Sequence, residues 1–102
     1  MHTEVSDKMP QIIALCKKYR VASMYLFGSA AIGDFNANSD IDFLVSFHDN
    51  VTLAEYADNY FDLLFEIEDM FGRKVDMVTE KSLSNPYFIR SVEQTKKLIY
   101  AA

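Results

Sequence analysis

The chain has 102 residues, half of them hydrophobic, and its 15 acidic against 10 basic side chains give a formal net charge of −5. This size and composition fit one small domain, residues 1–102, that folds without disulfides, and the negative charge disfavours a nucleic-acid partner. Because the sequence shows no signal-peptide-like stretch, no window long enough to cross a bilayer and a single cysteine, Cys16, we expect a cytoplasmic protein that does not associate with a membrane.

The first part of the sequence predicts a helix, a strand and a tight turn. Apolar residues recur at helical spacing from about residue 6 to 19, and residues 21–27 have the composition of a short strand. The strand is expected to end in the turn Gly28-Ser29, and a second short helix is expected to begin at Ser29 and to include residues 30–33.

A second strand is expected at residues 40–47, after a polar loop formed by residues 34–39. Apolar side chains occupy both alternating sets of positions in this strand, which is typical of a central strand covered on both faces of a sheet. Asp40 and Asp42 are separated by one residue, so their side chains point to the same side of the sheet.

The clearest helix in the sequence covers residues 53–71. Its apolar positions follow helical spacing and face away from the acidic residues Glu55, Asp58, Asp62, Glu66 and Asp69. Ala54, Phe61 and Phe65 widen the apolar stripe on one flank, and ordinary packing explains this width at least as well as a partner surface does. Gly72 is expected at the C′ position, where it ends the helix.

The remaining elements predict the fold class. Residues 74–78 form an apolar strand that contains Asp76. Asn85, followed by proline, is a typical N-cap that opens a helix through about residue 95, and residues 98–100 predict a last short strand. The alternation of helices and strands predicts an α/β (α+β) fold, with a small mixed β-sheet of three to four strands flanked by helices.

Asp40, Asp42 and Asp76 would repel one another if adjacent strands bring them together. Two like charges about 4 Å apart repel by about 4 kcal/mol at an effective dielectric constant near 20. Protonation, salt bridges or a bound metal can offset this repulsion. Clustered carboxylate oxygens suit Mg²⁺, which also binds water and substrate phosphates.

The Gly28-Ser29 turn predicts a phosphate-binding element. Gly28 lets the backbone turn tightly and approach a ligand closely, and Ser29 offers a hydroxyl and a backbone N–H at an expected helix start, where anions are favoured. Phosphate on one side of a cleft and divalent cations on the other are typical of phosphoryl or nucleotidyl transfer.

These residues resemble a known family. Gly28-Ser29, ten further residues and Asp40-x-Asp42, with Asp76 in a downstream apolar strand, resemble the DNA polymerase β-type nucleotidyltransferase superfamily, in particular its minimal nucleotidyltransferase branch. The resemblance implies that Asp40 and Asp42 bind two Mg²⁺ ions and that Asp76 completes the site of the ion that activates the acceptor hydroxyl. All three aspartates are therefore implied to be catalytic, and Gly28 and Ser29 to hold the triphosphate of a nucleotide, with ATP expected.

The resemblance also implies a partner. Members of this branch are commonly encoded beside an all-helical HEPN-domain protein, and some act as antitoxins that transfer AMP from ATP to a tyrosine of that protein. About 100 residues leave little room for helices that grip an acceptor. We therefore expect a complex with a HEPN-type protein, and a homodimer is an open alternative.

The sequence departs from the family pattern at Ile32, where many relatives carry an arginine in a Gly-Ser-x-Ala-Arg-Gly run. Loss of this cation is consistent with an alternative function, a weak or inactive nucleotide-binding module that regulates a helical partner by binding. Lys74 or Lys81 can supply another cation, although a solvated surface lysine is the simpler interpretation of both. The presence of all three aspartates favours the enzyme.

Overall fold

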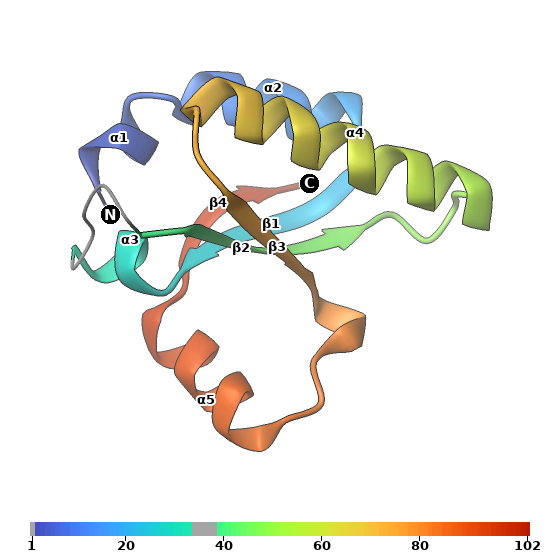
Figure 1. Ribbon diagram of the computed structural model, residues 1–102. Coiled ribbons are helices and arrows are strands. Elements are labelled where there is room, and N and C mark those ends of the chain that lie inside the picture. Colours follow the sequence, from blue (N-terminus) through green and yellow to red (C-terminus); the bar gives the residue numbers. More distant parts are fainter. Residues whose placement is uncertain (1, 34–38) are drawn as a thin grey trace.

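The computed structural model describes residues 2–33 and 39–102, so the predicted polar loop lies outside the described residues except for Ser39. A four-stranded sheet with the order β3-β2-β1-β4 forms the middle layer of the protein (Figure 1). In chain order the elements are α1 (Thr3–Ser6), α2 (Met9–Lys18), β1 (Val21–Phe27), α3 (Ser29–Ile32), β2 (Ile41–Phe47), α4 (Leu53–Phe71), β3 (Val75–Thr79), the 3-10 helix η1 (Glu80–Ser82), α5 (Pro86–Thr95) and β4 (Lys97–Ala101).

The sheet is mixed, as the sequence predicts. Strand β1 pairs antiparallel with β2 and with β4, whereas β2 pairs parallel with β3. Strand β2 lies inside the sheet, and its side chains are buried on both faces: Phe43 belongs to one hydrophobic core and Leu44 to another. The prediction of a central strand at this position is confirmed.

Helices cover both faces of the sheet. Helices α2 and α4 lie side by side on one face, and α5 lies on the other (Figure 1). The larger core includes Ile12, Met24 and Ile67, which are fully buried. A smaller core forms around Phe27, Leu44 and Val92. Burial of one such side chain stabilises the fold by about 1.5–3 kcal/mol.

The helix ends follow the local sequence signals. The side chain of Thr52 caps α4 by accepting a hydrogen bond from the backbone N–H of Glu55, and Gly72 ends this helix with a positive φ of 63°. The side chain of Asn85 accepts hydrogen bonds from two backbone N–H groups in the first turn of α5, with Pro86 as the first helical residue. These caps confirm the predicted bounds of both helices.

The N-terminal region differs from its prediction, because two helices replace the expected single helix. Helix α1 is capped by His2, whose Nδ1 accepts a hydrogen bond from the backbone N–H of Glu4. A continuous helix would place Pro10 in its interior, where the ring would clash with the carbonyl of Ser6. The chain instead begins a new helix, α2, in which Pro10 lies in the first turn.

Other differences are small. Strand β2 begins at Ile41, so Asp40 lies directly before the strand, and η1 was not predicted. Cys16 is buried, and burial raises the pKa of its thiol to about 12, in agreement with a structural role. Among the helices of residues 2–33 and 39–102, none is long and apolar enough to cross a lipid bilayer.

Candidate active site

The sheet brings the predicted aspartates to one place. The parallel register of β2 and β3 sets Asp42 directly opposite Asp76, and the backbones of neighbouring strands lie about 4.8 Å apart. Both residues have the same parity as Leu44 and Val78, which pack in the smaller core beneath α5. Asp40 precedes Asp42 by two residues, so all three aspartates lie on the α5 face, where β2 and β3 begin.

The electrostatics of this group are unfavourable without a cation. Asp42 is half-buried, and burial together with the negative charges of Asp76 and Asp40 raises the pKa of its carboxyl from 3.8 to about 6. Asp40 forms an ion pair with Lys74, with 3.9 Å between Oδ2 and Nζ. Both partners are exposed, so this pair offsets little of the repulsion.

The donor set fits Mg²⁺ in its chemistry. Carboxylate oxygens are the protein ligands that Mg²⁺ prefers, and a dication between Asp42 and Asp76 would relieve the repulsion that raises the Asp42 pKa. In the ranges that the structure describes, no three His, Cys, Asp or Glu side chains stand close enough together to hold a metal ion as they are. Asp40 and Asp76 are exposed, so close packing does not restrain rotation of either side chain.

Gly28 lies against the carboxylate of Asp42. The register of β1 and β2 sets Phe27 opposite Asp42, and Gly28 follows directly with a φ of +72°, a conformation that side-chain-bearing residues rarely adopt. A Cβ atom at Gly28 would lie 2.5 Å from Oδ2 of Asp42. The turn therefore requires glycine both for its backbone conformation and for the space beside the aspartate.

The Gly-Ser turn is fixed from a distant part of the chain. The backbone N–H of Gly28 donates a hydrogen bond of 3.1 Å to Oγ1 of Thr95, at the end of α5. The carbonyl of Gly28 accepts hydrogen bonds from Ala31 and Ile32, which close the short helix α3 that begins at Ser29, as predicted. Sequence analysis missed Thr95, because a threonine at a helix end carries no specific signal.

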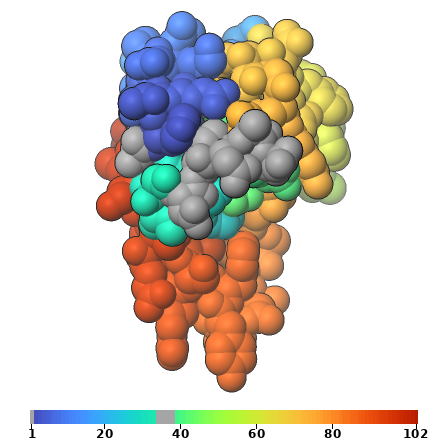
Figure 2. All heavy atoms as spheres, turned by 60° about the vertical axis from the view of Figure 1, so that its left-hand side comes forward, coloured from blue at the N-terminus to red at the C-terminus, as the bar shows by residue number. Residues whose placement is uncertain are grey.

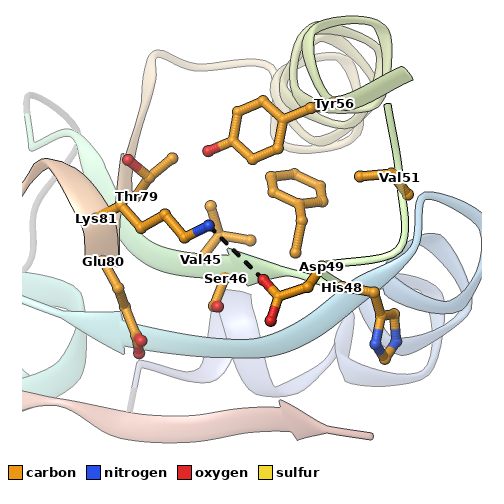
Figure 3. A pocket seen from close by; sticks show the side chains of 10 residues that line it. Val45, Ser46, His48, Asp49, Val51, Tyr56, Thr79, Glu80 and Lys81 are labelled. Atoms are coloured by element: carbon orange, nitrogen blue, oxygen red, sulfur yellow. Dashed lines mark ion pairs between the residues drawn. The ribbon is translucent and has the colours of Figure 1, made fainter. Parts of the chain in front are cut away.

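The two lysines considered as replacements for the arginine occupy different ends of β3. Lys74 precedes the strand and lies beside Asp40. Lys81 follows the strand, pairs with Asp49 at 3.7 Å and lines a small cavity of about 80 Å³ at that end (Figure 3). Its interpretation as a surface lysine is confirmed. Ile32 itself is 59% exposed.

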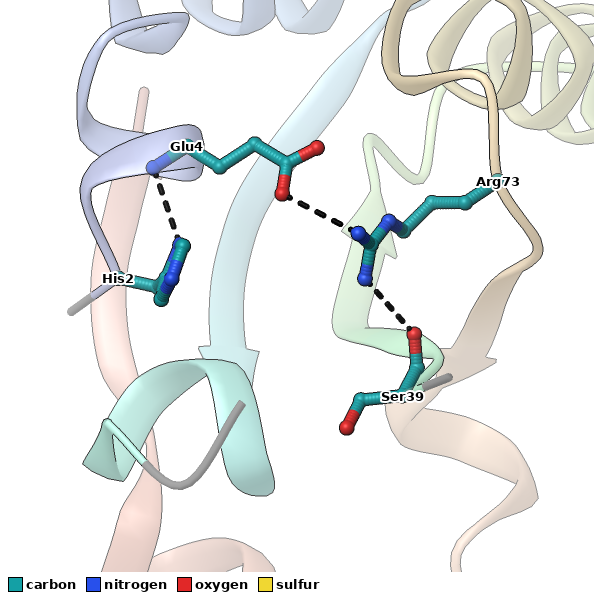
Figure 4. Close-up of polar contacts among 4 residues, drawn as sticks. All are labelled: His2, Glu4, Ser39 and Arg73. Atoms are coloured by element: carbon teal, nitrogen blue, oxygen red, sulfur yellow. Dashed lines mark hydrogen bonds and ion pairs between the residues drawn. The ribbon is translucent and has the colours of Figure 1, made fainter. Parts of the chain in front are cut away.

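A further residue, Arg73, holds the start of β2 and was also missed. Its Nη1 donates a hydrogen bond of 3.0 Å to the carbonyl of Ser39, and its Nη2 lies 3.4 Å from Oε2 of Glu4 (Figure 4). Ser39 is the residue before Asp40. Arg73 therefore links α1 and the loop before β3 to the backbone that carries the first aspartate.

The space-filling view gives the surroundings of this end of the sheet. Helix α3 lies between the N-terminal helices above it and α5 below it (Figure 2). The backbone N–H of His2 donates a hydrogen bond of 2.8 Å to the carbonyl of Ala30. The N-terminal segment is therefore part of the support of the Gly-Ser turn, together with Thr95.

Comparisons with known proteins agree with this geometry. Residues 11–99 match the model of a family described as a nucleotidyltransferase domain. A Methanocaldococcus jannaschii protein, named as a candidate protein adenylyltransferase, is 42% identical over 83 residues, which cover 81% of this chain and 79% of the relative. A second relative from the same organism, with the same description, is 36% identical over 88 residues and covers 84% of this chain and 82% of its own length.

Solved structures give the same result. A candidate minimal nucleotidyltransferase superposes with a TM-score of 0.70 at 28% identity and covers 95% of both chains. A chain from a toxin–antitoxin complex with AMP-PNP superposes with a TM-score of 0.71 at 25% identity, covering 92% of this chain and 73% of the other. The polymerase β-like fold expected from the sequence is confirmed.

Proposed function

The chain belongs to the nucleotidyltransferase domain family, and we propose that it transfers AMP from ATP to a hydroxyl group of a partner protein. The observation that carries this proposal is the pairing of Asp42 with Asp76 on adjacent strands, directly beside the Gly28 turn. This pairing supports the proposal because it sets two carboxylates, the kind of ligand that Mg²⁺ prefers, beside a Gly-Ser turn.

In the proposed reaction an acceptor hydroxyl attacks the α-phosphorus of ATP, and the bond to the β-phosphate breaks with release of pyrophosphate. Asp40, Asp42 and Asp76 would hold two Mg²⁺ ions. When bound, these ions lower the pKa of the acceptor hydroxyl and neutralise charge on the leaving group. The protein supplies the fixed position of Asp42 and the adaptable positions of the two exposed aspartates.

Gly28 and Ser29 take different parts in nucleotide binding. The backbone N–H of Gly28 already donates to Thr95, so we assign Gly28 the role of making room for the carboxylate of Asp42. The contact with the triphosphate is assigned to Ser29, whose hydroxyl and N–H lie at the start of α3. Lys74 is the nearby cation for a triphosphate, since its pair with Asp40 is exposed and therefore weak.

A toxin is the partner that we propose. The candidate protein adenylyltransferase among the relatives supports a protein acceptor, and the toxin–antitoxin complex with AMP-PNP supports both the nucleotide and the kind of assembly. We propose that the chain is an antitoxin that modifies a tyrosine of a helical HEPN-type toxin. Its small size is consistent with an acceptor that comes from a second chain.

A transfer assay tests the proposal. The purified chain is incubated with α-labelled ATP, Mg²⁺ and the neighbour-encoded protein, and label on that protein is measured. We expect transfer by the wild type and by the control variant Asp49→Asn, which alters an exposed acid that follows β2 at the end away from Asp42, and loss of transfer in Asp42→Asn. Transfer that persists in Asp42→Asn would remove these aspartates from the mechanism.

The exposed Ile32 favours a second candidate function. Without an arginine at this position the domain can bind a nucleotide weakly and regulate its partner by binding alone. This second function predicts that the wild type neutralises the toxin without labelling it, and that Asp42→Asn neutralises equally well. The same assay, combined with a growth test of toxin neutralisation, separates the two functions.

A further inference from the structure

Helix α4 exposes a row of apolar side chains that the fold does not use. Leu53, Ala57, Phe61 and Phe65 follow one another at intervals of four residues and form one ridge along the helix, here called the α4 ridge. Leu53 is 85% exposed, Phe61 52% and Phe65 59%. The explanation of the wide apolar stripe by ordinary packing is therefore wrong for Phe61 and Phe65.

A groove runs beside the α4 ridge. It has a volume of about 490 Å³ and lies between α4 and the edge strand β3. Ala57, Tyr60 and Phe61 line it from the helix, and Met77 and Val78 line it from the strand. The rings of Phe61 and Phe65 stack with 6.2 Å between their centroids. Ridge and groove together offer apolar contacts on both sides of an incoming side chain.

Side chains of α4 form hydrogen bonds with the outer edge of β3 at two positions. The backbone N–H of Val75 donates a hydrogen bond of 3.2 Å to Oε2 of Glu68, and the hydroxyl of Tyr60 donates a hydrogen bond to the carbonyl of Met77. An added strand would have to displace both contacts. The groove therefore accepts side chains from a helix more readily than the backbone of a strand.

The outer side of the α4 ridge is acidic. Asp58, Asp62 and Asp69 are exposed there, and none of the three forms an ion pair within the described part of the chain. Glu66, which lies farther around the helix, is by contrast paired with Lys18 at 3.6 Å. A row of unpaired negative charges beside an apolar ridge complements a partner with positive charges at the same spacing.

We propose that the α4 ridge and its groove dock an amphipathic helix of a partner protein whose apolar row is flanked by lysine and arginine. A second copy of the chain fits this surface poorly, because it would set the same aspartates against one another and carries a net charge of −5. The surface lies between α4 and the edge strand β3, whereas Asp42 and Asp76 have the parity of Leu44 and Val78, which pack in the smaller core beneath α5. The docking proposal rests on the α4 ridge and its groove and does not depend on catalysis.

Two synthetic peptides of about 18 residues, or five helical turns, test the proposal. They share the same leucine row, flanked by lysine in one and by glutamate in the other. Fluorescence anisotropy measures their binding to the chain. We expect the lysine peptide to bind, the glutamate peptide not to bind, and the double variant Phe61→Ser, Phe65→Ser to lose about tenfold in affinity.

Two further variants complete the experiment. A control that removes exposed apolar side chains elsewhere, Tyr87→Ser with Leu98→Ser, should bind as the wild type does. The variant Asp58→Asn with Asp62→Asn should bind the lysine peptide several-fold more weakly. Circular dichroism confirms that each variant is folded.

Three outcomes would overturn the proposal. If no lysine peptide binds, the surface is not a docking site for a basic helix. If the Phe61→Ser, Phe65→Ser variant binds as tightly as the wild type, the attraction is charge alone. If sedimentation shows a wild-type dimer that this variant dissociates, the occupant is a second copy of the chain.

Discussion

Asp42 and Gly28 lie so close together that the missing side chain of one makes room for the carboxylate of the other. A Cβ atom at Gly28 would approach Oδ2 of Asp42 to 2.5 Å, well inside the separation of two atoms in van der Waals contact. Gly28, which directly follows β1, and Asp42 of β2 therefore form one structural unit. Changes to either residue should be felt at the other.

The first prediction concerns the variant Gly28→Ala. It should displace the Asp42 carboxylate and strain the backbone at a φ of +72°, with a loss of about 1–3 kcal/mol in the free energy of unfolding and loss of AMP transfer. Gly33→Ala is a matched control, because Gly33 has a φ of +87° but no described atom within 4 Å of an added Cβ. It should lose comparable stability in urea unfolding and keep the transfer activity.

A second prediction concerns pH. Burial and the neighbouring carboxylates raise the pKa of Asp42 from its ordinary value of 3.8 to about 6 in the folded chain, so the folded state holds this proton more tightly than the unfolded state. The stabilisation from protonated Asp42 is present below about pH 4 and is lost as the pH rises through 6. In the absence of metal, Asp42→Asn should therefore be more stable than the wild type at pH 7.5.

The size of this effect is limited by solvent. A rise in pKa from 3.8 to about 6 corresponds to about 3 kcal/mol for a fully buried group, and screening of the half-exposed Asp42 reduces this free energy to about 1 kcal/mol. Urea unfolding of the wild type and of Asp42→Asn in EDTA, from pH 4.5 to 7.5, measures this difference in the free energy of unfolding. A stability difference that stays constant over this range would assign the gain to something other than the charge of Asp42.

Magnesium should make the wild type more stable than Asp42→Asn at pH 7.5, the reverse of the order expected without metal. Mg²⁺ that binds the folded chain stabilises it by about 1.4 kcal/mol at ten times its dissociation constant, and this gain should be larger at pH 7.5 than at pH 5.5, because protons compete for the carboxylates. Thermal unfolding with and without Mg²⁺ measures the gain without any need for activity. Asp58→Asn should respond as the wild type does, and an equal response from Asp42→Asn would place the ion elsewhere.

Arg73 provides a fourth prediction, because its contact with Glu4 and its contact with Ser39 can be removed separately. Glu4→Gln breaks the ion pair and leaves the hydrogen bond from Arg73 to the Ser39 carbonyl, so it should cost about 0.5–1 kcal/mol of stability and little Mg²⁺ affinity. Arg73→Gln loses both contacts and should also weaken Mg²⁺ binding, because the backbone before Asp40 is no longer held. Isothermal titration calorimetry with Mg²⁺ distinguishes the two variants. If Glu4→Gln and Arg73→Gln bind Mg²⁺ with equal affinity, Arg73 is a purely structural residue.

Sequence patterns predicted the elements whose signals are local. The apolar run of β2, the stripe of α4 and the cap at Asn85 each follow from a few neighbouring residues. The aspartates could be placed on one face because the period of a strand is fixed. Their convergence needed the parallel pairing of β2 with β3, which periodicity alone did not predict.

Other features depend on contacts between distant residues, and no local pattern reports them. The hydrogen bond from Gly28 to Thr95 and the bridge from Arg73 to Ser39 join segments 67 and 34 positions apart. The exposure of Phe61 and Phe65 depends on the placement of α4 in the fold, because no element of the described residues covers this flank of the helix. The break at Pro10, by contrast, was readable from the ring of proline alone.

Strand β3, which carries Asp76, lies at the edge of the sheet. One edge of β3 pairs with β2, and the other edge contacts side chains of α4. Peripheral strands fray at a lower free energy than the interior of a fold. Each such excursion would carry Asp76 away while Asp42 stays in register with β1. The three aspartates can thus separate while most backbone amide protons remain protected from exchange. A helix docked between α4 and β3 would suppress this fraying and keep the carboxylate of Asp76 in place.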